Sequence, residues 1–168
     1  MQKLREQKDV TYQLSLDVPL YAQRNIQELK QNILPDEVID QNPCTIALWR
    51  PFSEDEAQNV LDSLYGVQPF EVIILFTPQI SYEDNVCTVY LPVIARGAIK
   101  LVHDLAQLFD PESVWNSKIV FRCVLTQYEK KYGVKLIDTA RPQNEKFLCN
   151  KLNIITNAGQ IQQLVLKG

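Results

Sequence analysis

The chain contains a single histidine, and histidine is the side chain best suited to move protons near neutral pH. This residue, His103, lies between Val102 and Asp104 in a segment with helical periodicity. No strand-like segment of the sequence contains a histidine. Because no nucleophile stands near it in the sequence, we interpret His103 as a surface or boundary residue rather than a catalytic base.

Three polar residues in strand-like runs could bind a phosphate group. Thr45 lies in the run CTIALW, and Arg122 and Thr126 lie in the run KIVFRCVLT. An arginine fork and two hydroxyls are donors that suit phosphate oxygens. The simpler interpretation is that all three are ordinary strand residues on a half-exposed face. Strand neighbours alternate between faces, so we expect Arg122, Val124 and Thr126 to share one face.

The four cysteines do not have the spacing of a metal site. They are Cys44, Cys87, Cys123 and Cys149, and no C-x-x-C pair occurs among them. Each lies in, or at the start of, a strand-like run, so we expect four buried, reduced thiols. The sequence also has no glycine-rich phosphate loop. We therefore expect neither a metal nor a cofactor.

Composition and the N-terminal residues indicate a cytoplasmic or nuclear protein that is not secreted. The chain has 168 residues and a net charge of −3, which gives no electrostatic footprint for duplex nucleic acid. Its first residues, MQKLREQKDV, contain no apolar signal region, and no apolar run approaches the ~20 residues that span a membrane. Residues 1–9 are expected to be disordered or extended.

Hydrophobic periodicity predicts strands with a few intervening helices. The expected strands are Val10–Leu16, Cys44–Trp49, Phe70–Phe76, Val86–Val93, Lys118–Thr126, Phe147–Ile155 and Ile161–Leu166. The expected helices are Leu20–Ile33, a helix that begins at a Ser53–Glu56 capping box and ends at Gly66, and Gly97–Phe109. We expect residues 77–85 to form a hairpin loop and residues 157–159 a tight turn. This order is typical of an α+β sheet covered by helices.

The same order resembles the two-histidine (2H) phosphoesterase superfamily, which includes 2′-5′ RNA ligases and cyclic nucleotide phosphodiesterases. Three segments carry the resemblance: YQLSLDVP before a helix, PCTIALW before a capped helix, and the closing FLCNKLNIITNAGQIQQLVLKG. The resemblance implies that residues 1–168 form one domain of two pseudo-symmetric lobes. It also implies V-shaped, mostly antiparallel sheets with helices on their outer faces. Thr45 and Thr126 would then face one another across a cleft.

The sequence departs from this family at both catalytic motifs. Family members carry two His-x-Thr motifs, in which one histidine activates the attacking oxygen and the other protonates the leaving oxygen. Pro43 stands at the first histidine position, two residues before Thr45. If Thr126 takes the second hydroxyl position, Val124 takes the second histidine position. The register stays open, but no register supplies a histidine, so the resemblance excludes two-histidine catalysis. It leaves Thr45, Arg122 and Thr126 as candidate phosphate ligands.

Three functions remain open. The first, which we favour, is a catalytically degenerate 2H-phosphoesterase-like protein that binds or scaffolds an RNA end, a nucleotide or a protein partner. The second is an active RNA or cyclic nucleotide phosphodiesterase that uses substitute residues. The third is a protein-interaction subunit on an unrelated α+β fold, in which the corner 49–52 (WRPF) docks a partner unless Trp49 belongs to the core. The basic and aromatic residues of 128–144 could also grip single-stranded RNA, although a solvated loop is the simpler interpretation.

Overall fold

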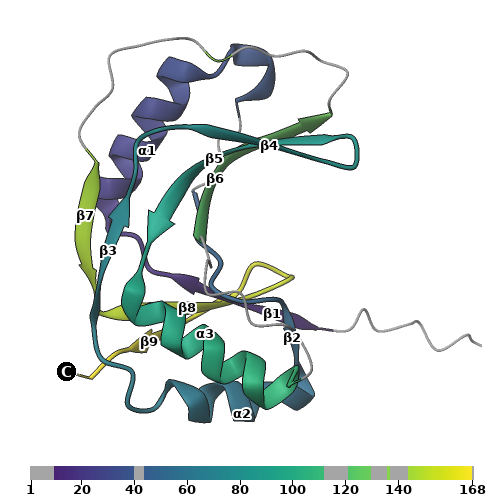
Figure 1. The fold of residues 1–168 in the computed structure, drawn as a ribbon, viewed down its shortest axis with the longest axis vertical. Coiled ribbons are helices and arrows are strands. Elements are labelled where there is room, and N and C mark those ends of the chain that lie inside the picture. The colour runs from purple at the N-terminus through teal and green to yellow at the C-terminus, as the bar shows by residue number, and fades with distance from the viewer. Residues whose placement is uncertain (1–9, 40–43, 112–120, 130–135, 137–143, 168) are drawn as a thin grey trace, which may run out of the picture.

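The computed structural model describes residues 10–39, 44–111, 121–129, 136 and 144–167. Within these ranges the chain forms two antiparallel sheets and three α-helices (Figure 1), which confirms the predicted α+β class. Residues 1–9, which we predict to be disordered or extended, lie outside the described residues.

Sheet A contains the N-terminal strand and the C-terminal hairpin. In spatial order its strands are β2 (Phe52–Ser53), β1 (Thr11–Leu16), β8 (Lys151–Thr156) and β9 (Ile161–Val165). The segment 44–49 lies along the β2 side of β1. There, the amide of Leu16 donates to the carbonyl of Ile46 at 3.0 Å, and Ser15 forms a single bridge with Ala47. The predicted strand Cys44–Trp49 is therefore extended and bonded to β1, without forming a continuous ladder.

Sheet B is built around one long central strand. Its strands are β4 (Gln79–Glu83), β5 (Val86–Ile94), β3 (Phe70–Ile74) and β7 (Glu145–Cys149), with β6 (Phe121–Glu129) also paired to β5. All pairs are antiparallel. One edge of β5 holds β6, and the opposite edge holds β4 and then β3. This arrangement leaves β6 on the side of sheet B that approaches the segment 44–49.

The three α-helices follow the predicted ranges closely. They are α1 (Leu20–Ile33), α2 (Glu54–Leu64) and α3 (Arg96–Phe109), and a short 3-10 helix η1 (Asp36–Val38) follows α1. Helices α2 and α3 lie together next to sheet A, whereas α1 lies towards the opposite end of the molecule (Figure 1). Gly97 allows α3 to approach β3 closely, because a Cβ atom there would lie only 2.9 Å from Cγ of Phe70.

Two predicted elements were wrong, and in both cases the error concerns which strand a segment pairs with. Residues 79–83, predicted as loop, form strand β4 on the edge of β5, and the turn shrinks to Asp84 and Asn85, with Asp84 at φ 50°. The predicted strand Phe147–Ile155 is two strands, because the chain leaves sheet B after β7 and enters sheet A as β8. Local periodicity does not encode this change of sheet.

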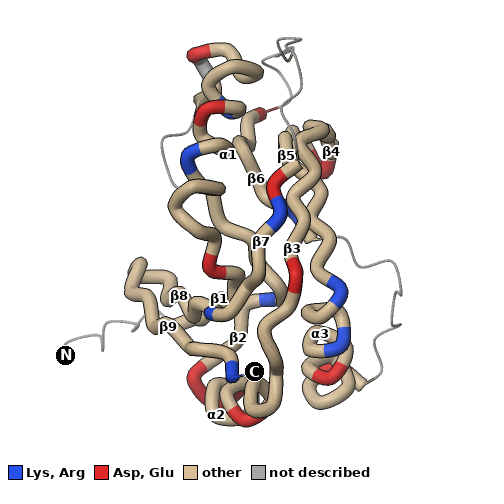
Figure 2. The backbone as a smooth tube through the Cα atoms, turned by 90° about the vertical axis from the view of Figure 1, so that its left-hand side faces the viewer, with Lys and Arg blue, Asp and Glu red and all other residues tan. Residues whose placement is uncertain are grey.

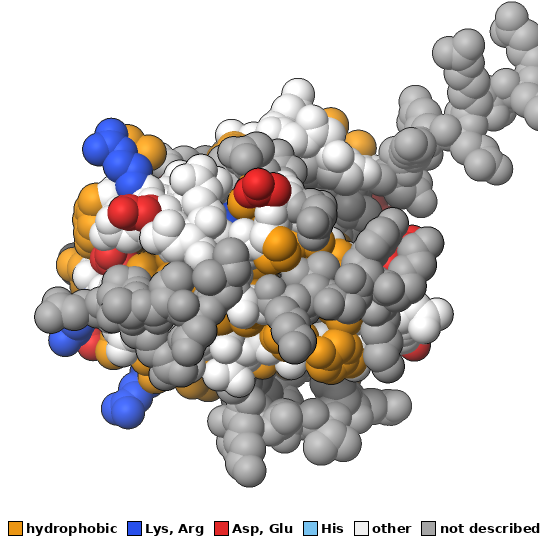
Figure 3. Space-filling view, turned by 90° about the horizontal axis from the view of Figure 1, so that it is seen from above, with side chains coloured by type: hydrophobic (Ala, Val, Ile, Leu, Met, Phe, Trp, Pro, Cys, Tyr) orange, Lys and Arg blue, Asp and Glu red, His pale blue; other side chains and the backbone are white. Residues whose placement is uncertain are grey.

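Charged residues of both signs are distributed along the described chain. Lys, Arg, Asp and Glu are interspersed in the view of Figure 2, and hydrophobic side chains reach the face seen in Figure 3 between polar ones. None of the described helices has the length and apolar content needed to cross a membrane.

Candidate ligand-binding cleft

The segment 44–49 and strand β6 together line an open cavity of about 390 Å³. Its lining residues are Thr45, Ala47, Leu48, Trp49, Phe121, Arg122 and Val124. Two of the three predicted phosphate ligands, Thr45 and Arg122, therefore line one cavity although they lie far apart in sequence. We call this cavity the cleft.

Strand alternation explains which side chains of segment 44–49 reach the cleft. Thr45, Ala47 and Trp49 line it from alternate positions, whereas Ile46 between them is fully buried and does not line it. Leu48, which is also buried, contributes to the lining as well. Alternation places successive side chains on opposite faces of an extended segment. Thr45 is exposed, so its hydroxyl is free to contact a ligand.

Arg122 supplies the positive charge of the cleft. It is exposed, and its guanidinium lies 4.3 Å from the centroid of the Tyr90 ring, on the neighbouring strand β5. A cation above an aromatic face is attracted to it, which restricts where the guanidinium points. A guanidinium donates several hydrogen bonds in a fixed fork and stays protonated in proteins. Arg122 can therefore bind a phosphate but cannot serve as an acid or a base.

Thr126, the third predicted ligand, does not face the cleft. Opposite Val89 and Tyr90 of β5, strand β6 carries Thr126 and Val124, so Leu125 is an extra residue that forms a bulge. Residues opposite one another share a face. Thr126 therefore shares the face of fully buried Val89, and its hydroxyl donates to the carbonyl of Val38 at 2.6 Å. The expectations that Thr126 lies beside Arg122 and that it faces Thr45 were both wrong.

We expect Thr126→Val to lower stability without changing ligand binding. The substitution keeps the shape of the side chain but removes the bond to the Val38 carbonyl, which costs about 1–2 kcal/mol of unfolding free energy. Urea unfolding measures this loss, and Thr11→Val, an exposed threonine on β1, provides the matched control. A loss of ligand affinity in Thr126→Val would show instead that the hydroxyl reaches the cleft.

The bulge also decides which residues of β6 alternate into the cleft. The alternating residues of β6 that line the cleft are Arg122 and Val124. The expected alternating pair, Val124 and Thr126, therefore does not share the cleft face, and the pair that does is Arg122 and Val124. Pro43, at the first histidine position, lies outside the described residues.

Trp49 is held at the end of the cleft by Arg50. The Arg50 guanidinium lies 4.3 Å from the Trp49 ring centroid. Its Nη2 is 2.9 Å from Oε2 of Glu56 in α2, and its Nε is 2.9 Å from Oδ2 of Asp110 at the end of α3. The predicted capping box of Ser53 and Glu56 is present, with the amide of Ser53 3.2 Å from Oε1 of Glu56. Arg50 thus connects the corner 49–52 to both α2 and α3 through ion pairs.

This network predicts an acid-dependent contribution to stability. Hydrogen bonds from Arg50 hold the pKa of Glu56 below its usual value of 4.5. The unfolded chain therefore takes up a proton first, and the contribution is complete above about pH 4.5 and falls with pH below that. Because the pair is partly exposed, we expect about 1 kcal/mol or less. Unfolding free energies of Glu56→Gln should accordingly show a weaker pH dependence between pH 5 and about pH 3 than those of the unsubstituted protein.

Glu54→Gln is the control for Glu56→Gln, because it removes another carboxylate from the same first turn of α2. Glutamine at position 56 keeps a capping-box acceptor, so the comparison isolates the ion pair. Equal pH profiles for Glu56→Gln and Glu54→Gln would contradict the assignment to Arg50.

A polar row on sheet A extends the cleft face. Ser15 lies opposite Ala47 on one side and Asn153 on the other, so these residues share the face that lines the cleft. Asn153 donates to Oδ1 of Asp17 at 3.3 Å, and Gln163 of β9 donates to Oδ1 of Asn153 at 3.3 Å. None of the predicted ligands belongs to this row. Its signal was the alternation of polar and apolar residues in β1.

The cysteines differ from the prediction of four reduced thiols. Cys44 and Cys123 form a disulfide, whereas Cys87 and Cys149 are buried and free. Burial raises the pKa of the Cys149 thiol above its usual value of 9.0, which keeps it protonated. The prediction failed for one pair because sheet packing brings together two residues that are 79 positions apart.

His103 does not line the cleft. It lies in α3, and its Nδ1 is 3.8 Å from Oδ1 of the neighbouring Asp104. The described part of the chain holds no group of three or more His, Cys, Asp or Glu residues that could bind a metal ion. The basic residues of segment 130–143, considered above as an RNA clamp, lie outside the described residues.

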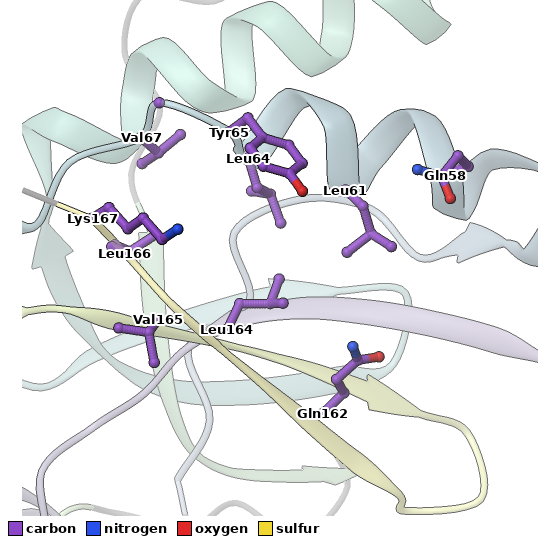
Figure 4. A pocket seen from close by; sticks show the side chains of 11 residues that line it. Gln58, Leu61, Leu64, Tyr65, Val67, Gln162, Leu164, Val165, Leu166 and Lys167 are labelled. Carbon is purple, nitrogen blue, oxygen red and sulfur yellow. The ribbon is translucent and has the colours of Figure 1, made fainter.

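A second cavity of about 370 Å³ lies between α2 and β9. In Figure 4, Leu61 and Leu64 of α2 point towards Leu164 of β9, and Tyr65 and Lys167 lie at the rim. The lining that the structure describes is mainly apolar and includes no acidic group. It therefore offers mainly apolar contact to a ligand.

Comparison with known structures shows that the fold of the chain is a known one. E. coli LigT in complex with NADP+ superposes with a TM-score of 0.62 at 13% sequence identity over 95% of each chain. TT0787 of Thermus thermophilus gives a TM-score of 0.54 at 13% identity, covering 94% of this chain and 95% of its own. The chain has the LigT fold. A protein described as a phosphoesterase also matches, with a TM-score of 0.53 at 14% identity over 95% of this chain and 97% of its own.

The predicted resemblance is thereby confirmed for the fold. No protein-family model matches the sequence, and no curated protein is significantly similar to it. The LigT fold also argues against the third hypothesis, an interaction subunit on an unrelated fold. In addition, Phe52 of the corner 49–52 is only 1% exposed, so its ring belongs to the core and is not available to a docking partner.

Proposed function

We propose that the chain is a nucleotide-binding or RNA-end-binding protein of the LigT fold that lacks two-histidine catalysis. One observation carries the proposal: the cleft presents a fixed cation, a hydroxyl and an aromatic ring, and none of its described lining residues can move a proton at neutral pH. Binding a phosphate needs only the first two of these groups.

The lining residues suit two different parts of a nucleotide, its phosphate and its base. Arg122 and Thr45 offer donors to the phosphate oxygens. Trp49, half-buried at the other end of segment 44–49, offers aromatic surface to a base, a contact worth about 1–3 kcal/mol in other proteins. LigT is described in complexes with NADP+ and with 3′-AMP, so nucleotides are the first ligands to test.

Calorimetric titration with 3′-AMP and with NADP+ tests the proposal. We expect saturable binding that weakens as salt is raised, because a phosphate–arginine contact is partly electrostatic. Absence of binding by both nucleotides up to millimolar concentration would contradict the proposal.

An assay with a 2′,3′-cyclic nucleotide separates this proposal from the alternative of an active phosphodiesterase. We expect no hydrolysis above the rate without protein, because the described residues that line the cleft include no acid or base. Hydrolysis that persists through repurification and disappears in Arg122→Ala would favour the enzyme.

A further inference from the structure

The disulfide between Cys44 and Cys123 joins the two walls of the cleft. The Cα atoms of the two residues are 6.3 Å apart, within the range that a disulfide spans. Cys44 begins the segment 44–49, and Cys123 lies in β6. These two elements contribute all seven described residues that line the cleft.

Each cysteine is a sequence neighbour of a ligand-facing residue. Cys44 precedes Thr45, and Cys123 lies between Arg122 and Val124. Side chains alternate along extended segments, so the sulfur atoms lie behind the wall while their neighbours point into the cleft. The bond therefore limits how far the hydroxyl of Thr45 and the guanidinium of Arg122 can move apart.

The site also accommodates the reduced state. Sγ of Cys44 lies 3.2 Å from the carbonyl oxygen of Val124, so a reduced Cys44 thiol has an acceptor ready. Cys44 is only half-buried, whereas Cys123 is fully buried. A small reagent can thus meet Cys44 first, and Cys123 can follow as the resolving thiol.

We propose that Cys44 and Cys123 form a thiol–disulfide exchange site that raises the affinity of the cleft for its nucleotide when oxidised. This inference rests on the proposed function. A linked pair of walls is preorganised, so less freedom is lost on binding. The partner is a small-molecule disulfide such as oxidised glutathione.

The exchange proceeds in two balanced steps. The Cys44 thiolate attacks one sulfur of the small disulfide, forms a mixed disulfide and releases one small thiolate. The Cys123 thiolate then attacks the Cys44 sulfur and releases the second. The two protein thiols lose two electrons and two protons in total, and the small disulfide takes them up to become two thiols.

The bond itself is tested first, without any ligand. The protein is incubated with either oxidised glutathione or dithiothreitol, and free thiols are then alkylated and mapped by mass spectrometry. We expect a Cys44–Cys123 cross-link only in the oxidised sample, with Cys87 and Cys149 free in both. An oxidised sample without this cross-link overturns the inference.

Affinity for 3′-AMP is then measured in both states. We expect the oxidised protein to bind about fivefold more tightly than the reduced protein. Cys44→Ser should bind at the reduced level in both conditions, and Cys149→Ala, which keeps the disulfide, should respond like the unsubstituted protein.

The two proposals fail in different ways. Equal affinity of the cross-linked and reduced proteins overturns the redox control and leaves the binding function in place. Absence of binding in both states contradicts the proposed function, and the redox control with it, whatever the cross-link mapping shows.

Discussion

Arg122→Ala is expected to weaken binding of 3′-AMP by about 10- to 100-fold. This range follows from the roughly 1.5–3 kcal/mol that a hydrogen bond to a charged group typically contributes. Arg122 is the only cation among the described residues that line the cleft, and Tyr90 restricts its guanidinium from the side. None of the other six could replace its charge.

We expect Arg122→Ala to lower ligand affinity without lowering the stability of the fold. Arg122 is exposed on β6, so we expect its removal to change the unfolding free energy by about 0.5 kcal/mol or less. Arg122→Lys keeps the charge but loses the fork, and an intermediate affinity is expected. The binding of the alanine variant should also depend less on salt than that of the unsubstituted protein.

Arg96→Ala is the matched control for this prediction. Arg96 is exposed at the start of α3 and does not line the cleft, so its removal changes the net charge equally without touching the site. Equal losses of affinity in Arg96→Ala and Arg122→Ala would show that Arg122 acts only through the net charge of the protein and does not contact the ligand. Unchanged affinity in Arg122→Ala would place the ligand elsewhere.

Phe52→Ala is expected to lower the unfolding free energy by about 3–5 kcal/mol. Phe52 is only 1% exposed, and its ring centroid lies 5.6 Å from that of Tyr12 and 6.1 Å from that of Trp49. Its removal leaves a cavity beneath the corner that Arg50 ties to α2 and α3. Because domains of this size are stable by only about 5–15 kcal/mol, the loss should be visible as a much lower urea midpoint.

The control and a milder variant keep this prediction testable if Phe52→Ala folds poorly. Tyr65→Ala also truncates an aromatic ring, but Tyr65 is 84% exposed, so we expect little change in stability. Phe52→Leu keeps most of the apolar volume and should fall between the two. A Phe52→Ala protein as stable as Tyr65→Ala would restore the interpretation of corner 49–52 as a surface for partners.

The predicted α-helices were accurate because their determinants are local. The range Leu20–Ile33 agrees with α1, and the capping box of Ser53 and Glu56 marks the start of α2. Three- and four-residue spacing of apolar residues, together with capping groups, requires no knowledge of the rest of the chain. The strands were predicted less well, because a strand is completed by its partner.

Among the candidate ligands, the residue types could be predicted but the geometry could not. Thr45 and Arg122 were recognised as donors from their positions in strand-like runs, and the structure places both on the cleft. The predicted orientation of Thr126 was wrong because Leu125 is an extra residue in β6 and forms a bulge opposite Val89 and Tyr90. A bulge depends on the pairing with β5, which the alternation within β6 does not reveal.

The sequence alone determined that this chain has one histidine and none in a strand-like segment, and that its helices and most of its strands follow from local periodicity. The tertiary structure decided that Arg122 faces the same cavity as Thr45, that Thr126 is buried and bonded to the Val38 carbonyl, and that Cys44 meets Cys123. The physical reason is that composition and periodicity depend on neighbours along the chain. The cleft, in contrast, is formed where two sheets bring distant segments together, and only their register decides which side chains share a face.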